Sequence, residues 1–250
     1  MNPAPVFRWL VSEPPDRARP LSDHLVELRR RLLWSLGVAV TATVVGSFYT
    51  RPFFESLSRS TGPLVFLTPT GAFLARLKMA IFLGVFVSAP VMLYHLWRFV
   101  AVALSVRERR ALMAILPASY ALFVGGVCLG WFFVLPAGLR FLMACANATL
   151  KPMISVESAL SFSLWTCLGL GFLFQFPVVL VALSRWGIIL PETLVRYRRV
   201  AFILILVAAA IVTPGPDILT QLLLALPTYV LYEVSLWVAR WVRPRSTPID

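Results

Sequence analysis

Long apolar stretches alternate with short polar, arginine-rich segments along most of this chain. A helix that crosses about 30 Å of hydrocarbon needs about 20 apolar residues. Six stretches fit this requirement wholly or nearly, at about residues 32–49, 77–97, 112–135, 160–183, 200–212 and 218–238. The pattern predicts an all-α polytopic membrane protein whose six transmembrane helices are organised by a lipid bilayer.

Composition agrees with a membrane protein and divides the chain into three parts. The chain is 59% hydrophobic and 14% charged, whereas a soluble domain is about a quarter charged. Residues 1–20 combine prolines with both signs of charge and lack the apolar core of a cleavable signal peptide. We expect residues 1–20 to form a flexible tail, residues 21–241 a membrane domain, and residues 242–250 a second tail.

The fifth apolar stretch is unusually short. Its 13 residues, 200–212, reach only about 20 Å as a helix. Such a segment requires a locally thinned bilayer, ends that snorkel to the interface, or shielding by a partner. The sequence Thr-Pro-Gly-Pro-Asp at 213–217 then predicts a tight hairpin into the sixth stretch.

The positive charges predict the orientation. With six spans, 17 of the 23 lysines and arginines fall on the side that carries both termini, and 6 fall on the other side. Cytoplasmic loops carry the excess of Lys and Arg, so both termini are expected in the cytoplasm. The net charge of +12 therefore reflects topology and anionic lipid and does not call for a nucleic-acid partner.

Two glutamates stand among these cytoplasmic arginines. Glu27 precedes Arg29, Arg30 and Arg31 at the start of the first span, and Glu108 lies in Arg-Glu-Arg-Arg at 107–110. A carboxylate accepts two hydrogen bonds from a guanidinium, so the pair is a candidate site for a cationic ligand. The alternative is internal pairing, of Glu27 with Arg31 at i,i+4 and of Glu108 with its neighbours.

Polar residues within or beside the spans are the next candidates. Gln175 should face the bundle interior or pair with a neighbouring helix backbone, because an amide in hydrocarbon requires partners. Thr213 and Gln221 flank the hairpin, where they either contact a partner helix or cap and solvate the turn. Glu233 is expected to pair with Arg240 or Arg199. The GxxxG pattern of Gly126 and Gly130 indicates close helix packing, within the chain or with another helix.

Signatures of catalysis are missing from the sequence. It has two histidines, three cysteines without CxxC spacing, no P-loop and no Gly-x-Ser-x-Gly, so no metal, cofactor or enzyme activity is predicted. An ion-coupled transporter would show internal repeats and an ionisable residue at mid-membrane, and neither is evident. An intramembrane enzyme would need a nucleophile with its base, or metal ligands, within the spans.

Short motifs spread over the spans give the chain a resemblance to a known family. Over residues 20–241 it resembles TatC, the multi-spanning receptor subunit of the twin-arginine protein translocase. The motifs lie, in the family's order, at residues 24–31, 67–73, 88–94, 107–110, 174–178, 186–188 and 213–217. Glu27, Glu108, Gln175, Thr213 and Gln221 each lie within or close to one of them.

The resemblance implies a concave, glove-shaped bundle with short fifth and sixth helices in the cytoplasmic (inner) membrane. It implies binding of twin-arginine signal peptides of folded cargo at Glu27 and Glu108, and transport driven by the proton-motive force. Partners would be TatA- and TatB-type single-span proteins, one contacting the region of Thr213 and Gln221, and other TatC copies. The chain departs from many relatives at Gly71 and Gln175, where they carry glutamates, so charge at these positions is absent.

Overall fold

The structure, a computed structural model, is helical throughout nearly all of the part that it describes. It describes residues 21–62, 64–101, 106–144, 154–213, 215 and 217–242, with the backbone alone at 21–24, 60, 101, 106–114 and 242. The two predicted tails lie outside these residues, except for residue 242. The elements in chain order are α1 (Leu21–Gly46), η2 (Ser47–Tyr49), α2 (Arg51–Thr61), α3 (Gly71–Ala101), α4 (Val106–Leu129), η3 (Gly130–Val134), α5 (Leu135–Ala144), α6 (Val156–Leu173), α7 (Gln175–Arg185), α8 (Pro191–Arg196), α9 (Arg198–Val212) and α10 (Ile218–Val242).

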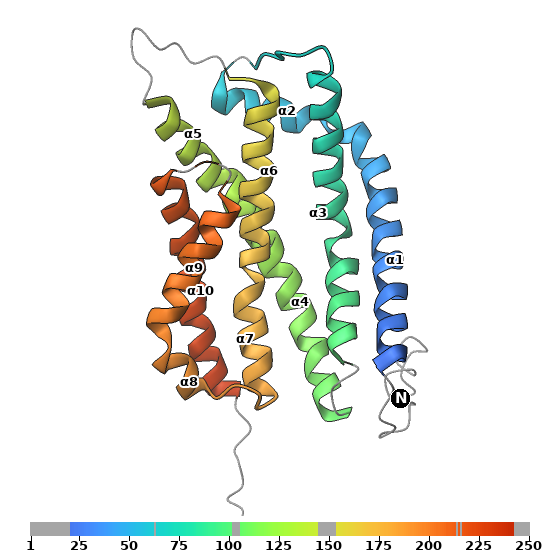
Figure 1. Ribbon diagram of the computed structural model, residues 1–250, viewed down its shortest axis with the longest axis vertical. Helices are drawn as coiled ribbons and strands as arrows, with labels where there is room; N and C mark the ends of the chain where they lie inside the picture. The colour runs from blue at the N-terminus through green and yellow to red at the C-terminus, as the bar shows by residue number, and fades with distance from the viewer. Residues whose placement is uncertain are drawn as a thin grey trace, which may run out of the picture.

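The helices stand side by side along the long axis of the molecule (Figure 1). α1 and α3 lie together at one edge, α9 and α10 form the opposite edge, and the α6–α7 rod runs between them, with α4 and α5 crossing obliquely. The start of α1, the end of α3, the start of α4, α8 and the end of α10 share the lower end of Figure 1. These are the segments for which the sequence predicts a cytoplasmic position.

Five helical segments are long and apolar enough to cross a bilayer within the described residues. They are Leu25–Tyr49, Gly71–Val100, Ile115–Ala144, Val156–Arg185 and Ile218–Trp241. The sixth predicted span is α9, whose 15 residues reach about 22 Å, so the expected short fifth helix is present. The expectation of a short sixth helix is wrong, because α10 has 25 residues and is long enough to cross a bilayer. Its start, like the end of α9, lies below the level of the upper ends of α3 and α6 (Figure 1).

Prolines explain where two of the spans change their helical geometry. Pro177 lies in the first turn of α7, where its missing N–H costs nothing to α7 but leaves the carbonyl of Leu173 without its i+4 donor. α6 accordingly ends at Leu173, and α7 starts at Gln175. Pro136 follows the π-helix η3, in which Leu135 N–H bonds the Gly130 carbonyl instead of the residue four positions back.

The pair of Gly126 and Gly130 brings α4 and η3 against α6. A Cβ on Gly126 would lie 2.8 Å from the Leu170 carbonyl oxygen, and a Cβ on Gly130 would lie 2.9 Å from Cys167 Cα. Only glycine leaves room for backbones this close. Of the two readings of the GxxxG pattern, packing within the chain is therefore the one that the structure shows.

The upper end of the bundle is closed by short elements. α2 lies across this end in Figure 1, and Val65 forms an isolated parallel bridge with Ser155 just before α6. Below the bridge, Lys78 Nζ of α3 contacts Glu157 Oε1 at 3.0 Å and Ser161 Oγ at 3.1 Å on α6. These polar contacts tie α3 to α6 at the end opposite Glu27.

Candidate functional site

Glu27 lies in the first turns of α1, at the arginine-rich end of the molecule. Arg31 Nε donates to Glu27 Oε1 at 3.1 Å, and Arg31 Nη2 bonds the same oxygen. The Glu27 side chain remains 26% exposed, while that of Arg31 is only 10% exposed. The i,i+4 pairing proposed from the sequence is thus present, and it leaves the carboxylate within reach of the aqueous boundary.

Glu108 belongs to α4, but its side chain lies outside the described residues. Its backbone position places it two residues after the start of α4. The starts of α1 and α4 both lie at the lower end of the molecule (Figure 1). The prediction that Glu27 and Glu108 act together therefore has support from the arrangement of their helices, and stays a prediction at the level of the two carboxylates.

An apolar groove opens beside the Glu27–Arg31 pair. It has a volume of about 230 Å³ and is bounded by α1 and α3, with one aromatic side chain each from α4 and α6. The polar residues in its wall are Arg31, Ser35 and His95. Its α1 and α3 walls are otherwise formed by Leu28, Leu32, Val85, Ala89, Met92, Leu93, Leu96 and Phe99.

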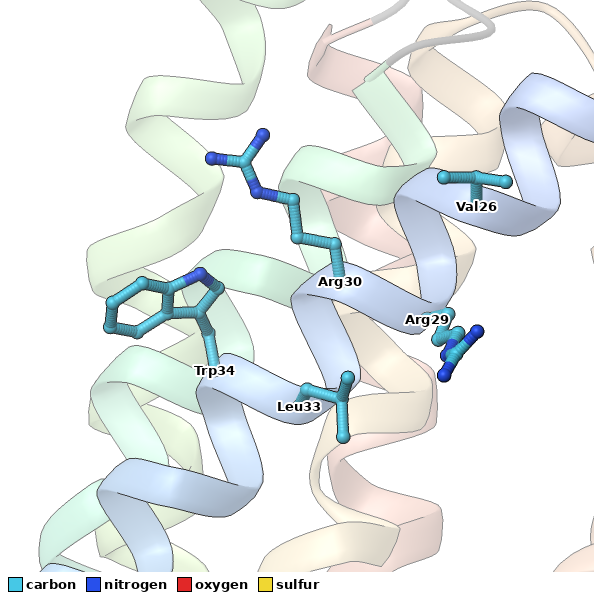
Figure 2. A pocket seen from close by; sticks show the side chains of 5 residues that line it. All are labelled: Val26, Arg29, Arg30, Leu33 and Trp34. Carbon is cyan, nitrogen blue, oxygen red and sulfur yellow. The ribbon is translucent and has the colours of Figure 1, made fainter.

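A second, more open hollow of about 430 Å³ lies on the surface of α1 (Figure 2). Its wall is formed by Val26, Arg29, Arg30, Leu33 and Trp34. Figure 2 shows Arg30 and Trp34 projecting to one side of the helix and Arg29 to the other. Since all five residues belong to one helix, this hollow is a shallow surface that combines two arginines with an indole.

Gln175 takes part in a hydrogen-bond chain that joins three helices. Trp97 Nε1 of α3 donates to Ser119 Oγ of α4 at 3.0 Å, and Ser119 Oγ donates in turn to Gln175 Oε1 of α7. Gln175 Nε2 donates to the Ser119 carbonyl at 3.1 Å. Trp97 and Ser119 are buried, so the amide satisfies a neighbouring helix backbone, as expected for a polar group in hydrocarbon.

The two hairpin residues are also hydrogen-bonded within the chain. Thr213 Oγ1 donates to the Ala209 carbonyl of its own helix at 2.7 Å and is buried. Gln221 Nε2 donates to the Leu206 carbonyl at 3.1 Å, which links α10 back to α9. Asp217 Oδ1 accepts from Thr220 N–H at 2.6 Å and so caps the start of α10. Both uses of Thr213 and Gln221 that the sequence left open remain, but a partner helix would have to share these bonds.

Glu233 pairs differently from the expectation. Its Oε2 lies 2.9 Å from Arg198 Nη2, and Tyr229 Oη donates to its Oε1 at 3.0 Å. The expected partners were Arg240 and Arg199. The rotation of α9 against α10 decides between adjacent arginines, and hydropathy does not determine this rotation.

Ser119 was not among the residues singled out from the sequence. Ser119 stands in an apolar run two residues after Pro117, and a hydroxyl in such a run is a usable signal. Its partner Gln175 is 56 positions away, so no local pattern could connect them. The same holds for Lys78 and Glu157, which are 79 positions apart.

The chain is similar in sequence to known proteins. The family model for the Sec-independent protein translocase protein TatC matches residues 23–227. The chain belongs to the TatC family. TatC proteins from Carboxydothermus hydrogenoformans and Aquifex aeolicus are each 34% identical to it over 92% of this chain, covering 97% and 99% of those proteins.

Solved TatC structures share the fold. A crystal structure described as the twin arginine translocase receptor TatC superposes with a TM-score of 0.76, at 32% identity, over 88% of this chain and 99% of that one. A second, described as TatC in DDM, gives 0.77 over 86% of this chain. The TatC-type helical bundle, with five long spans and the short α9 among the described residues, is therefore confirmed, and the protein is a membrane component of a Sec-independent protein translocase.

Proposed function

We propose that this TatC protein is the signal-peptide receptor and core subunit of its translocase. In this proposal it binds twin-arginine signal peptides of folded proteins and exports them across the cytoplasmic membrane, using the proton-motive force together with TatA- and TatB-type partners. The observation that carries it is Glu27, a partly exposed carboxylate already bonded to a guanidinium at the arginine-rich end of α1. Glu108 near the start of α4 supplies the second carboxylate of the proposed site.

The Glu27–Arg31 pair suggests how an incoming arginine is bound. Arg31 contacts the carboxylate through two nitrogens that share one oxygen, Oε1. A peptide guanidinium that shares or replaces this contact presents parallel N–H donors, for which a lysine ammonium has no equivalent geometry. The paired arginines of the signal peptide would then be read by Glu27 and Glu108.

Substitution of the two carboxylates tests the proposal. A charge-assisted hydrogen bond is worth about 1.5–3 kcal/mol, so Glu27→Gln or Glu108→Gln should weaken binding of a fluorescent twin-arginine peptide about ten- to a hundredfold. Glu55→Gln is a matched control, because Glu55 forms an i,i+4 pair with Arg51 at 2.9 Å on α2, near the opposite end. Unchanged binding in the double variant Glu27→Gln, Glu108→Gln would reject the site.

The remaining assignments belong to the same proposal. Both termini, including the tails at 1–20 and 242–250, lie in the cytoplasm, and the protein resides in the inner membrane, as the distribution of arginines supports. Thr213 and Gln221 lie beside a TatA- or TatB-type helix, and Gln175 provides a polar contact inside the concave face. TatC copies and lipid complete the set of partners.

A further inference from the structure

The groove between α1 and α3 has a lining that suits one kind of occupant. It is almost entirely apolar along its length, and its rim includes Leu32 and Leu96, which are 65% and 55% exposed. In a bilayer these exposed rim residues face lipid. The groove therefore opens toward the acyl chains and not toward the protein interior.

Charge gathers at the end of the groove nearest Glu27. Arg31 and His95 line it, one from α1 and one from α3. Arg29 and Arg30 are exposed on the adjoining surface of α1, and Arg98 follows His95 by three residues on α3. Among the described residues that line the groove none is acidic, and Glu27 beside it is bonded to Arg31.

Two buried nitrogens belong to residues that line the groove. Arg31 Nη1 and His95 Nδ1 have no hydrogen-bond partner within the part of the chain that the structure describes, and the Arg31 residue is 9% exposed. Buried polar atoms without a partner are rare and call for one that is missing. Oxygen acceptors at the head of an apolar chain would meet this need.

We propose that this groove is a binding site for an anionic phospholipid. One acyl chain lies along the apolar walls between α1 and α3. The phosphate and ester oxygens lie near Arg31 and His95, with Arg29 and Arg30 contributing attraction from the surface. Basic pockets between membrane helices on the cytoplasmic side are known to select anionic headgroups. This inference does not rest on the proposed arginine-recognition site, although the two share Arg31, which bonds Glu27 there and lines the groove here.

The lining of the groove favours an acyl chain over an extended peptide. An extended peptide would bring backbone N–H and C=O groups into a wall whose polar members are Arg31, Ser35 and His95. Unsatisfied backbone groups are costly in hydrocarbon, whereas an acyl chain has none.

Photolabelling of the full chain in vesicles tests the proposal. The probe is phosphatidylglycerol with a diazirine on one acyl chain, compared with phosphatidylcholine carrying the same chain, and the labelled peptides are identified by mass spectrometry. We expect phosphatidylglycerol to label α1 and α3 around Leu32, Ala89 and Leu96 at least about fivefold more than phosphatidylcholine does. A fivefold preference corresponds to about 1 kcal/mol, the attraction expected from a single nearby cation.

Variants separate a specific site from general contact with lipid. Ala89→Phe fills the groove from α3, and Leu96→Trp narrows its exposed rim without changing the buried core; each should lower labelling of α1 and α3. Arg29→Gln with Arg30→Gln should remove the preference for phosphatidylglycerol. Arg196→Gln with Arg199→Gln is the matched control, because both arginines are exposed at α8 and α9, outside the groove, and labelling should persist.

Three results would overturn the lipid site. The first is equal labelling by the two lipids, and the second is labelling of α1 and α3 that Ala89→Phe and Leu96→Trp both leave unchanged. The third is occupation by another ligand: a twin-arginine peptide with the diazirine in its apolar segment labels these residues while phosphatidylglycerol does not. Because the Glu27 and Glu108 variants are read by peptide affinity, the two proposals fail separately.

Discussion

Ser119 is the residue through which three helices are hydrogen-bonded to one another. Its hydroxyl accepts from Trp97 on α3 and donates to Gln175 on α7, and its carbonyl accepts from the Gln175 amide. Ser119→Ala removes the two hydroxyl bonds. Bonds between membrane helices average about 0.6 kcal/mol and reach about 1.7, so we expect a loss of roughly 1–3 kcal/mol in unfolding free energy, measured by denaturant titration in detergent micelles. Ser163→Ala is the control, since Ser163 is also buried but bonds only the Ala159 carbonyl of its own helix; equal losses in both variants would contradict this role. The sequence indicates that Gln175 needs a partner, because an amide in an apolar run always does. It does not identify Ser119, because contacts across the bundle depend on helix rotation. The Glu27–Arg31 pair is local and could be predicted from the sequence. The partner of Glu233, Arg198, lies on another helix and could not.

α4 and η3 lie close against α6 at Gly126 and Gly130. The neighbouring Gly125 offers a control for the tightness of this packing. A Cβ at Gly126 would meet the α6 backbone, whereas a Cβ at Gly125 would have nothing within 4 Å. Gly126→Ala should therefore lower the thermal midpoint, since overpacking costs about 1–3 kcal/mol. Gly125→Ala should leave it unchanged or raise it, because alanine is the better helix former by about 1 kcal/mol. Equal responses of the two variants, followed by thermal unfolding in detergent, would show that the approach at Gly126 is not tight.

At the hairpin, replacing Thr213 by Val and Gln221 by Leu removes the bonds to Ala209 and Leu206. We expect this double variant to keep normal affinity for a twin-arginine peptide while export and hairpin–partner crosslinks decrease; retained crosslinks and export would exclude the contact. The spans themselves were predictable because a bilayer forces backbone groups to bond within a helix. Pro177, which lies within an apolar run, is the sequence signal for the helix break at Phe174. The π-helix η3 was not located from the sequence, although Pro136 lies beside it.

The whole molecule gathers its arginine-rich connections at one end, and this arrangement fixes a test of orientation. In a background without the three native cysteines, Ser58→Cys on α2 should react with a membrane-impermeant maleimide added to intact cells. Arg196→Cys on α8 should react only after the cells are opened. The physical reason is the retention of Lys- and Arg-rich loops on the cytoplasmic side. Labelling of Arg196→Cys in intact cells would reverse the model. The hydropathy pattern anticipated the number of spans and the shortness of α9, since both depend on length and composition. The order of helices across the bundle and the groove between α1 and α3 depend on which faces pack together. These came only with the three-dimensional arrangement.

Helix α1 precedes the other described helices in the chain and lies at the edge of the bundle, packed mainly on α3. Only 17% of its span is buried within the protein, against 56% of the span formed by α6 and α7. During biogenesis it therefore exposes to lipid much the same surface before its neighbours are made as it does in the finished fold. Its main packing partner is the next span, which begins at Gly71. Assembly of the bundle can then proceed from the α1–α3 pair as each later helix leaves the ribosome.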